Sequence, residues 1–270
     1  MSYASFWRRN LGFFRLAIIT NLEYRVNFFT DAVAQPVLSS LIEVLLWFAV
    51  FRSVSSETVA GFGREYYLAY AVWAAFVSRI TSNWMYEFRM IEDIESGAVN
   101  TLLARPTSFF EYYLSQFLGY KAITSAISLL VPLAVVVWFG LPTQLARLPG
   151  TLALAAWYLV LVHCMSFCVS TIAFRLNKVS GFTMAKNLGL WLFSGELFPL
   201  DLIPEPYRAW LTAQPFANAV YVPVGYLTGR LGTETLLTGF VSTAGGIAFF
   251  GGLGAWLWFR GLRTYSGTGA

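Results

Sequence analysis

The sequence predicts a single all-α membrane protein domain, residues 1–270, with six transmembrane helices. Its 270 residues are 57% hydrophobic and only 12% charged, whereas about a quarter of the residues in an average soluble domain are charged. Six apolar stretches approach or exceed the roughly 20 residues that a membrane-crossing helix needs. The polar sequence between them is too short to build a separate soluble domain.

Residues 1–28 predict an amphipathic helix that lies on the inner membrane surface. Apolar side chains recur at helical spacings of three and four residues, while Arg8, Arg15 and Glu23 lie off this stripe. The stripe consists of Trp7, Leu11, Phe14, Ile18, Leu22, Val26 and Phe29. Arg15 interrupts the apolar stretch and no small-residue cleavage site follows, which argues against a secretion signal. The alternative is that this segment begins a long first span.

The six predicted spans follow the apolar stretches in chain order. They are Asp31 to Phe51, Tyr66 to Tyr86, Tyr113 to Phe139, Gly150 to Phe174, Ser180 to Pro199 and Thr233 to Phe259. If the N-terminus is inside, the inner segments hold ten lysines and arginines and the outer segments hold five. Because cytoplasmic flanks carry the excess of these residues, both termini are expected in the cytoplasm and the chain in a bacterial-type inner membrane. The net charge of +4 then follows from topology and predicts no nucleic-acid partner.

Glu43, Arg79, Lys121, Lys186 and Glu196 fall within the predicted spans, where charge is costly and therefore suggests function. Arg79, Lys121 and Lys186 all lie roughly 9 to 12 Å from the cytoplasmic ends of their spans. They would line a basic inner vestibule for an anionic or zwitterionic amphiphile, or else extend their long side chains to the inner interface. Glu196 is expected at the end of span five as a cap, an outer gate or a substrate contact, and Glu43 could lie near Arg79.

Residues 88–110 form the longest predicted cytoplasmic connection, between spans two and three. Its apolar side is formed by Ile91, Ile94, Leu102 and Leu103, and its acidic side by Glu92, Asp93 and Glu95. Gly97 is expected to end a short helix. Such a helix suits docking into a groove on a soluble partner. The alternative is a solvated loop whose acids keep it in the cytoplasm.

Residues 199–230 predict short external helices that dip into the outer leaflet. Each of the prolines removes a backbone donor and prevents a continuous helix; they are Pro199, Pro204, Pro206, Pro215 and Pro223. The segment is nevertheless too apolar for a free loop, and broken backbone at membrane depth survives only when protein covers it.

The last span carries small residues four apart, which permit close helix packing within this subunit or at a subunit interface. The pairs are Ser242 and Gly246, Ala248 and Gly252, and Gly251 and Ala255. His163, Cys164 and Cys168 on span four form an incomplete zinc site, so we expect packing residues there and no metal site. No catalytic or cofactor-binding residues are predicted.

Two groups of residues resemble the permeases of type 2 ATP-binding-cassette (ABC) exporters, in particular the subgroup of about this length with six spans. The first group is Ile94, Gly97, Leu102, Leu103, Arg105 and Pro106. The second is Ser194, Gly195, Pro199, Leu200, Pro204, Pro215, Phe216 and Pro223. The resemblance runs from the first span to the last, through loose motifs.

The resemblance implies a dimer of permease chains, identical or related, driven by two copies of an ATPase subunit. It places a coupling helix between spans two and three, so that Glu92, Asp93, Ile94, Glu95, Gly97, Leu102, Arg105 and Pro106 would touch the ATPase. Pro199, Pro204 and Phe216 would belong to the outer gate. No G-x-x-x-x-G-K-[ST] motif occurs, so ATP and magnesium would bind the partner and this chain would be no enzyme.

Two other classes compete with the exporter. An ion-coupled secondary transporter or channel would use the same intramembrane charges, but paired broken helices in two related halves are expected of it and the sequence shows one broken region. A membrane-embedded enzyme needs clustered catalytic side chains at one depth, and the chain has a single histidine and scattered carboxylates.

Overall fold

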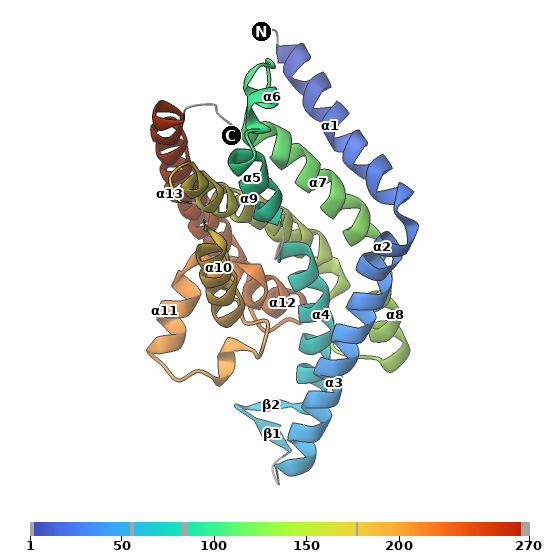
Figure 1. The fold of residues 1–270 in the computed structure, drawn as a ribbon. Helices are drawn as coiled ribbons and strands as arrows, with labels where there is room; N and C mark the ends of the chain where they lie inside the picture. The colour runs from blue at the N-terminus through green and yellow to red at the C-terminus, as the bar shows by residue number, and fades with distance from the viewer. Residues whose placement is uncertain (1–2, 55–56, 83–85, 177, 266–270) are drawn as a thin grey trace.

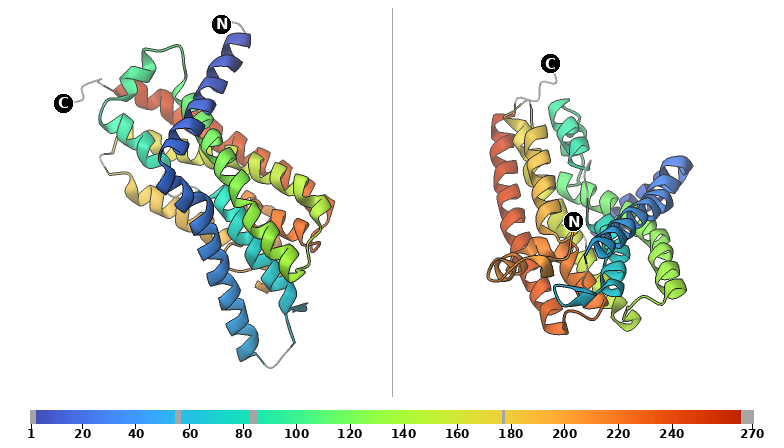
Figure 2. Two further views of the ribbon diagram at one scale, coloured as in Figure 1. Left: turned by 90° about the vertical axis from the view of Figure 1, so that its right-hand side faces the viewer. Right: turned by 90° about the horizontal axis from the view of Figure 1, so that it is seen from below.

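The computed structural model describes residues 3–54, 57–82, 86–176 and 178–265, with side chains from residue 6 onward. The described chain is almost entirely helical, and its two ends lie toward the same end of the molecule (Figure 1). The β1–β2 hairpin lies at the opposite end (Figures 1 and 2).

The N-terminal half consists of α1 (Tyr3–Glu23), α2 (Arg25–Phe29), the π-helical turn η1 (Thr30–Ala34), α3 (Gln35–Ser53), β1 (Thr58–Val59), β2 (Phe62–Gly63), α4 (Arg64–Thr81), α5 (Tyr86–Glu95), α6 (Val99–Leu103), α7 (Phe109–Ser128) and α8 (Leu130–Phe139). The C-terminal half consists of η2 (Leu145–Arg147), α9 (Leu148–Thr171), η3 (Ile172–Phe174), α10 (Ser180–Phe193), η4 (Leu200–Leu202), α11 (Tyr207–Ala213), η5 (Pro215–Ala219), α12 (Tyr221–Leu227) and α13 (Thr233–Thr264).

Four helical stretches of the described chain are long and apolar enough to cross a membrane: Arg25–Ser53, Phe109–Phe139, Leu145–Phe174 and Thr233–Thr264. They correspond to predicted spans one, three, four and six. The predicted all-α membrane class is therefore confirmed. Spans two and five correspond to shorter helices, α4 and α10.

Predicted span two does not end at Tyr86. α4 already ends at Thr81, and Tyr86 is instead the first residue of a second helix, α5. Predicted span five is also shorter than expected, because α10 ends at Phe193 and not at Pro199. Gly195 follows with φ of +82°, where an added Cβ would lie 2.8 Å from Cβ of Tyr221.

The core is built around α9 and α4. Trp73 and Phe76 of α4 pack with Leu154, Tyr158 and Leu161 of α9 in the largest buried cluster. Of the 18 residues of α4, 14 are buried. They lie on all sides of the helix, so α4 is enclosed by other segments of the chain. In the right-hand view of Figure 2, α13 runs alongside the rest of the bundle.

Small residues of α13 permit its close packing on α9, as predicted. An added Cβ at Gly246 would lie 3.0 Å from Leu161, and one at Gly254 would lie 2.8 Å from Phe167. This contact lies within one subunit. At Gly252, by contrast, an added Cβ would meet nothing within 4 Å.

α1 packs across α7, where an added Cβ at Gly119 would lie 2.5 Å from the carbonyl oxygen of Phe14. Part of the predicted apolar stripe of α1 faces away from the protein, since Trp7 is 58% and Leu11 is 48% exposed, whereas Phe14 and Ile18 are half-buried. The structure extends this helix to Glu23 and starts α2 at Arg25, so the predicted 1–28 segment covers α1 and most of α2.

The proline-rich residues 199–230 form short helices, as their prolines predict. η5 and α12 fold back against α9, α4 and α13, and residues such as Val222 and Val224 are buried in the main core. α11 lies at the side of the molecule, and its Trp210 is 61% exposed (Figure 1).

Candidate functional site

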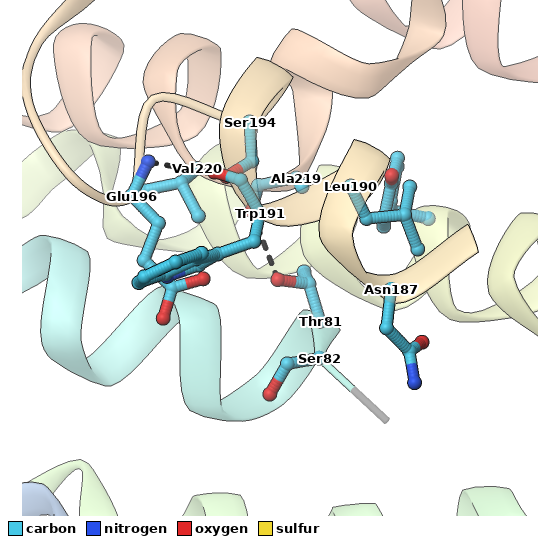
Figure 3. A pocket seen from close by; sticks show the side chains of 10 residues that line it. Thr81, Ser82, Asn187, Leu190, Trp191, Ser194, Glu196, Ala219 and Val220 are labelled. Carbon is cyan, nitrogen blue, oxygen red and sulfur yellow. Dashed lines mark hydrogen bonds between the residues drawn. The ribbon is translucent and has the colours of Figure 1, made fainter. Parts of the chain in front are cut away.

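A small pocket with polar and apolar walls lies where α4 ends, between α9, α10 and η5 (Figure 3). Its lining includes Thr81, Ser82, Tyr158, Trp191, Ser194 and Glu196. The pocket volume is about 30 Å³, whereas pockets for drug-sized ligands measure about 300–1,000 Å³. In this conformation the pocket has room for water or for a group of ammonium size.

Hydrogen bonds between distant segments hold the walls of the pocket. The Thr81 hydroxyl donates to the carbonyl of Ala219 at 3.1 Å, which ties α4 to η5. The backbone N–H of Tyr221 donates to the carbonyl of Ser194 at 2.9 Å, which ties α12 to the end of α10. The N–H of Glu196 donates to the hydroxyl of Ser194 at 3.1 Å. The pocket therefore sits where three chain segments meet.

Glu196 enters this pocket from the turn after α10, and its carboxylate has the hydroxyl of Ser78 as a hydrogen-bonding neighbour. The carboxylate of Glu43, on α3, is close enough to repel it. Within the described residues, neither carboxylate has a lysine or arginine nitrogen within 4.0 Å. Both acids therefore lack an ion-pair partner among the described residues.

Lys121 binds the broken end of α4. Its ammonium donates to the carbonyls of Arg79 and Ser82, both at 2.7 Å. These carbonyls belong to the last turn of α4 and have no continuing helix to accept from. A cation at a helix C-terminus also interacts favourably with the helix dipole. Lys121, from α7, therefore satisfies the interruption between α4 and α5.

Arg79 is neutralised by an acid of the first apolar helix. Its guanidinium lies 2.9 Å from a carboxylate oxygen of Asp31 and also donates to the Asp31 carbonyl at 3.2 Å. The Tyr120 hydroxyl donates to the same carboxylate at 2.6 Å. The ion-pair partner of Arg79 is therefore Asp31 and not Glu43, which the sequence suggested could lie near it.

Lys186 pairs with Glu87 in the most enclosed ion pair of the described chain. The two charged groups are 2.7 Å apart, and their side chains are 6% and 0% exposed. The Ser166 hydroxyl donates to Glu87 at 2.9 Å, and Lys186 donates to Ser166 at 3.0 Å. α5, α9 and α10 are joined at this point.

The three cations predicted to line a vestibule are therefore each occupied by groups of this chain. Arg79 and Lys186 have carboxylate partners, and Lys121 has two carbonyl partners. Their positions within apolar stretches of the sequence indicated polar contacts between helices, and each of the three makes such contacts. The sequence alone could not distinguish a cation that binds a ligand from a cation that stabilises the fold.

The predicted docking segment has most of its apolar side turned inward, with Leu103 as the exposed exception. Ile94 is 2% and Leu102 is 6% exposed, and both pack with Phe109 and Phe167 in a second core cluster. As a correction to the expectation of direct contact, these two residues are already covered by the chain itself. Gly97, with φ of +79°, lies in the turn after α5, where it was expected to end the helix.

The remaining predicted docking residues are at or near the surface. Glu92, Glu95, Arg105 and Pro106 are exposed. Asp93 is half-buried and accepts a hydrogen bond from Tyr113 at 2.5 Å.

Arg9 of α1 fixes the end of this segment. Its guanidinium donates to the carbonyl of Pro106 and lies 2.8 Å from Glu111 of α7. The N-terminal helix thus contacts the segment that follows α6, near the same end of the molecule as both termini (Figure 1).

Asp201 forms a polar cluster that the sequence reasoning missed. Its side chain is 1% exposed and accepts hydrogen bonds from the hydroxyls of Tyr66 at 3.1 Å and Tyr221 at 3.0 Å. Arg230 lies 3.2 Å and Arg208 4.0 Å from its carboxylate. The sequence feature that could have indicated this cluster is Asp201 itself, an acidic residue in an apolar, proline-rich stretch.

The three residues predicted for the outer gate occupy different environments. Pro199 is buried beside η4, Pro204 is exposed, and Phe216 is half-buried against the main core. His163 is fully buried, with its ring nitrogens 3.2 Å from the Tyr86 hydroxyl and 3.1 Å from the Phe110 carbonyl. Among described residues, no group of three His, Cys, Asp or Glu side chains could hold a metal.

An almost entirely helical chain with four span-length apolar helices and a buried ion pair among its described residues is a multi-pass membrane protein. A family model described as ABC-2 family transporter protein matches residues 37–269. The chain therefore belongs to the ABC-2 transporter family, and the predicted resemblance is confirmed. It is the permease type of component in an ABC transporter and is not itself catalytic. A comparison with curated proteins gave no match.

Proposed function

We propose that this chain is the permease of an ABC exporter that uses ATP hydrolysed by a separate ATPase subunit. The observation that carries the proposal is the two-sided α5–α6 segment of an ABC-2 family chain: its apolar side is anchored in the permease core, and Glu92 and Glu95 are left exposed. Such a segment can receive a force from a docked partner and pass it inward.

Six crossings are compatible with the lengths of the helices. α4 has 18 residues and α10 has 14, which correspond to about 27 Å and 21 Å of helix. The hydrocarbon core measures about 30 Å, so α4 nearly crosses it by itself, and α10 would cross it together with the short helices of residues 199–230. Both termini and the α5–α6 segment then lie in the cytoplasm of a bacterial-type inner membrane.

Residues 199–230 form the external re-entrant part of this proposal. η5 and α12 close the path from the outside, since they cover the pocket at Ala219 and Val220. The Asp201 cluster joins this part to α4 through Tyr66.

Force on the docking face would reach the pocket through contacts between α5, α9 and α10. Ile94 and Met90 make α5 move with α9, and the buried Glu87–Lys186 pair couples α5 to α10. α10 carries Trp191 of the pocket wall. Two discrete arrangements of these helices would alternately open the path to either side. Two permease chains, identical or related, and two ATPase copies would form the transporter, with ATP and magnesium bound by the ATPase.

The test is purification of the tagged protein from its native host in mild detergent, followed by identification of co-purifying ATPase and an ATP hydrolysis assay. We expect Glu92→Arg with Glu95→Arg to lose the ATPase, because the exposed acids are reversed while the buried anchor is kept. Glu57→Arg, an exposed acid beside β1 at the other end, is the matched control.

An intact complex of the Glu92 and Glu95 double variant would refute docking at this face. A lone wild-type permease that still moves solute without an ATPase would refute the exporter and favour an ion-coupled carrier.

A further inference from the structure

We propose that the pocket beside Glu196 binds the cationic head of the cargo, so that the exported molecule is an organic ammonium amphiphile. This inference rests on the proposed transport function and names its substrate class. It differs from the expectation from the sequence, where three cations suggested an anionic or zwitterionic amphiphile.

The carboxylates of Glu196 and Glu43 differ from the three cations in lacking an ion-pair or carbonyl partner among the described residues. Arg79 and Lys186 have carboxylates of this chain as the counter-charges that buried or intramembrane charges require, and Lys121 donates to two backbone carbonyls. Glu196 and Glu43 receive no counter-charge from the described residues, and they repel each other. The undescribed residues include no lysine or arginine. A cation from outside the chain is the group that completes this site.

A second, independent observation is the hydroxyl of Tyr158. The residue is 1% exposed and lines the same pocket as Glu196, and its hydroxyl has no hydrogen-bond partner among the described residues. A buried polar group without a partner costs about 1–3 kcal/mol. A ligand that donates a hydrogen bond, as an ammonium does, would satisfy it.

The pocket also carries the aromatic wall that organic cations favour. Trp191 and Tyr158 line the pocket. In Figure 3 the side chains of Trp191 and Glu196 lie together to the left of Thr81 and Ser82. A cation over an aromatic face gains about 0.5–2 kcal/mol, with tryptophan the best partner. Carboxylate, hydroxyl and indole together distinguish an ammonium from an anion.

Size and surroundings limit the rest of the cargo. About 30 Å³ of pocket admits an ammonium group and not a bulky ring system. The outward side of α10 is apolar, with Leu188 51% and Leu192 46% exposed. An alkyl tail would lie along this side while its head lies in the pocket.

The experiment measures binding to the purified permease–ATPase complex in lipid nanodiscs. The probes are octylammonium, octyl sulfate and octanol, which share one chain length and differ in head charge. We expect octylammonium to bind at least about tenfold more tightly than octyl sulfate or octanol, because one charge-assisted hydrogen bond changes the affinity by about this factor. ATP hydrolysis is recorded on the same samples.

Variants locate the binding. Glu196→Gln, which keeps the shape and removes the charge, should weaken octylammonium binding about tenfold or more and leave octanol binding unchanged. Tyr158→Phe should weaken it by a smaller factor, and Glu43→Gln by a factor between the two. Glu234→Gln, an exposed acid in the first turn of α13, is the matched control.

Equal binding of the three probes to the wild-type complex would overturn the inference even if Glu196→Gln does not assemble. Displacement of octylammonium by millimolar sodium or potassium alone would assign the site to an inorganic cation and would also overturn it. Neither result touches the proposed function, which fails separately when no ATPase accompanies the chain.

Discussion

Two buried carboxylates organise the two halves of this membrane protein in different ways. Glu87, near the α5–α6 segment, is 0% exposed and has one cationic partner, Lys186, itself only 6% exposed. Asp201, in the proline-rich segment, is 1% exposed, but its cations Arg208 and Arg230 are 30% and 34% exposed. Water can therefore replace the partners of Asp201 and cannot replace the partner of Glu87.

This difference suggests different mechanical roles. A buried pair with a single cation behaves as a fixed joint, because removing either member leaves an uncompensated charge. A carboxylate at the edge of solvent, shared by two arginines and two tyrosines, can exchange one partner at a time. The inner joint suits force transmission between α5 and α10, and the Asp201 cluster suits a closure that opens and reforms.

The largest effect should follow from breaking the inner joint. Lys186→Met removes the cation and leaves Glu87 charged and buried, which should cost about 3–5 kcal/mol of unfolding free energy. Thermal unfolding of the detergent-solubilised protein measures it. Lys178→Met, on the exposed segment before α10, is the control. Adding Glu87→Met to Lys186→Met should recover much of the loss, and a double variant less stable than the single one would contradict the single-pair account.

An intermediate effect is expected at Asp201. Asp201→Asn keeps an acceptor for one tyrosine hydroxyl and removes the charge that both arginines face, so we expect a loss of about 1–3 kcal/mol. Because Arg208 and Arg230 can turn to water, the loss should stay below that of Lys186→Met. The same thermal unfolding experiment compares the two variants directly, and an equal or larger loss at Asp201 would remove the distinction between joint and closure.

The sequence predicted the helices better than their interruptions. The spans follow from apolar length, but the break between Thr81 and Tyr86 carries no proline or glycine. It is satisfied by Lys121 from another helix, and such a tertiary contact leaves no local signal. The end of α10 did have a local signal in Gly195.

The candidate site shows the same limit. The amphipathic pattern of residues 88–110 assigned Ile94, Leu102 and Leu103 to one apolar side, of which Ile94 and Leu102 are buried and Leu103 is exposed. It could not tell whether Ile94 and Leu102 would pack on the chain itself or on a partner, because both burials require the same spacing. The Asp201 cluster joins residues up to 135 positions apart, so its partners were beyond any reading of local pattern.

The smallest effect should come from one arginine of the Asp201 cluster. Arg230→Met removes a partner that is 34% exposed, and pairs near solvent contribute about 0–1 kcal/mol. Tyr66, Tyr221 and Arg208 remain on the carboxylate, so the unfolding free energy should fall by less than about 1 kcal/mol. If Asp201 acts as a releasable closure, this variant should alter the rate of ATP-driven transport in nanodiscs or vesicles more than it alters stability. A stability loss as large as that of Asp201→Asn, with an unchanged transport rate, would make the cluster a fixed joint like the Glu87 pair.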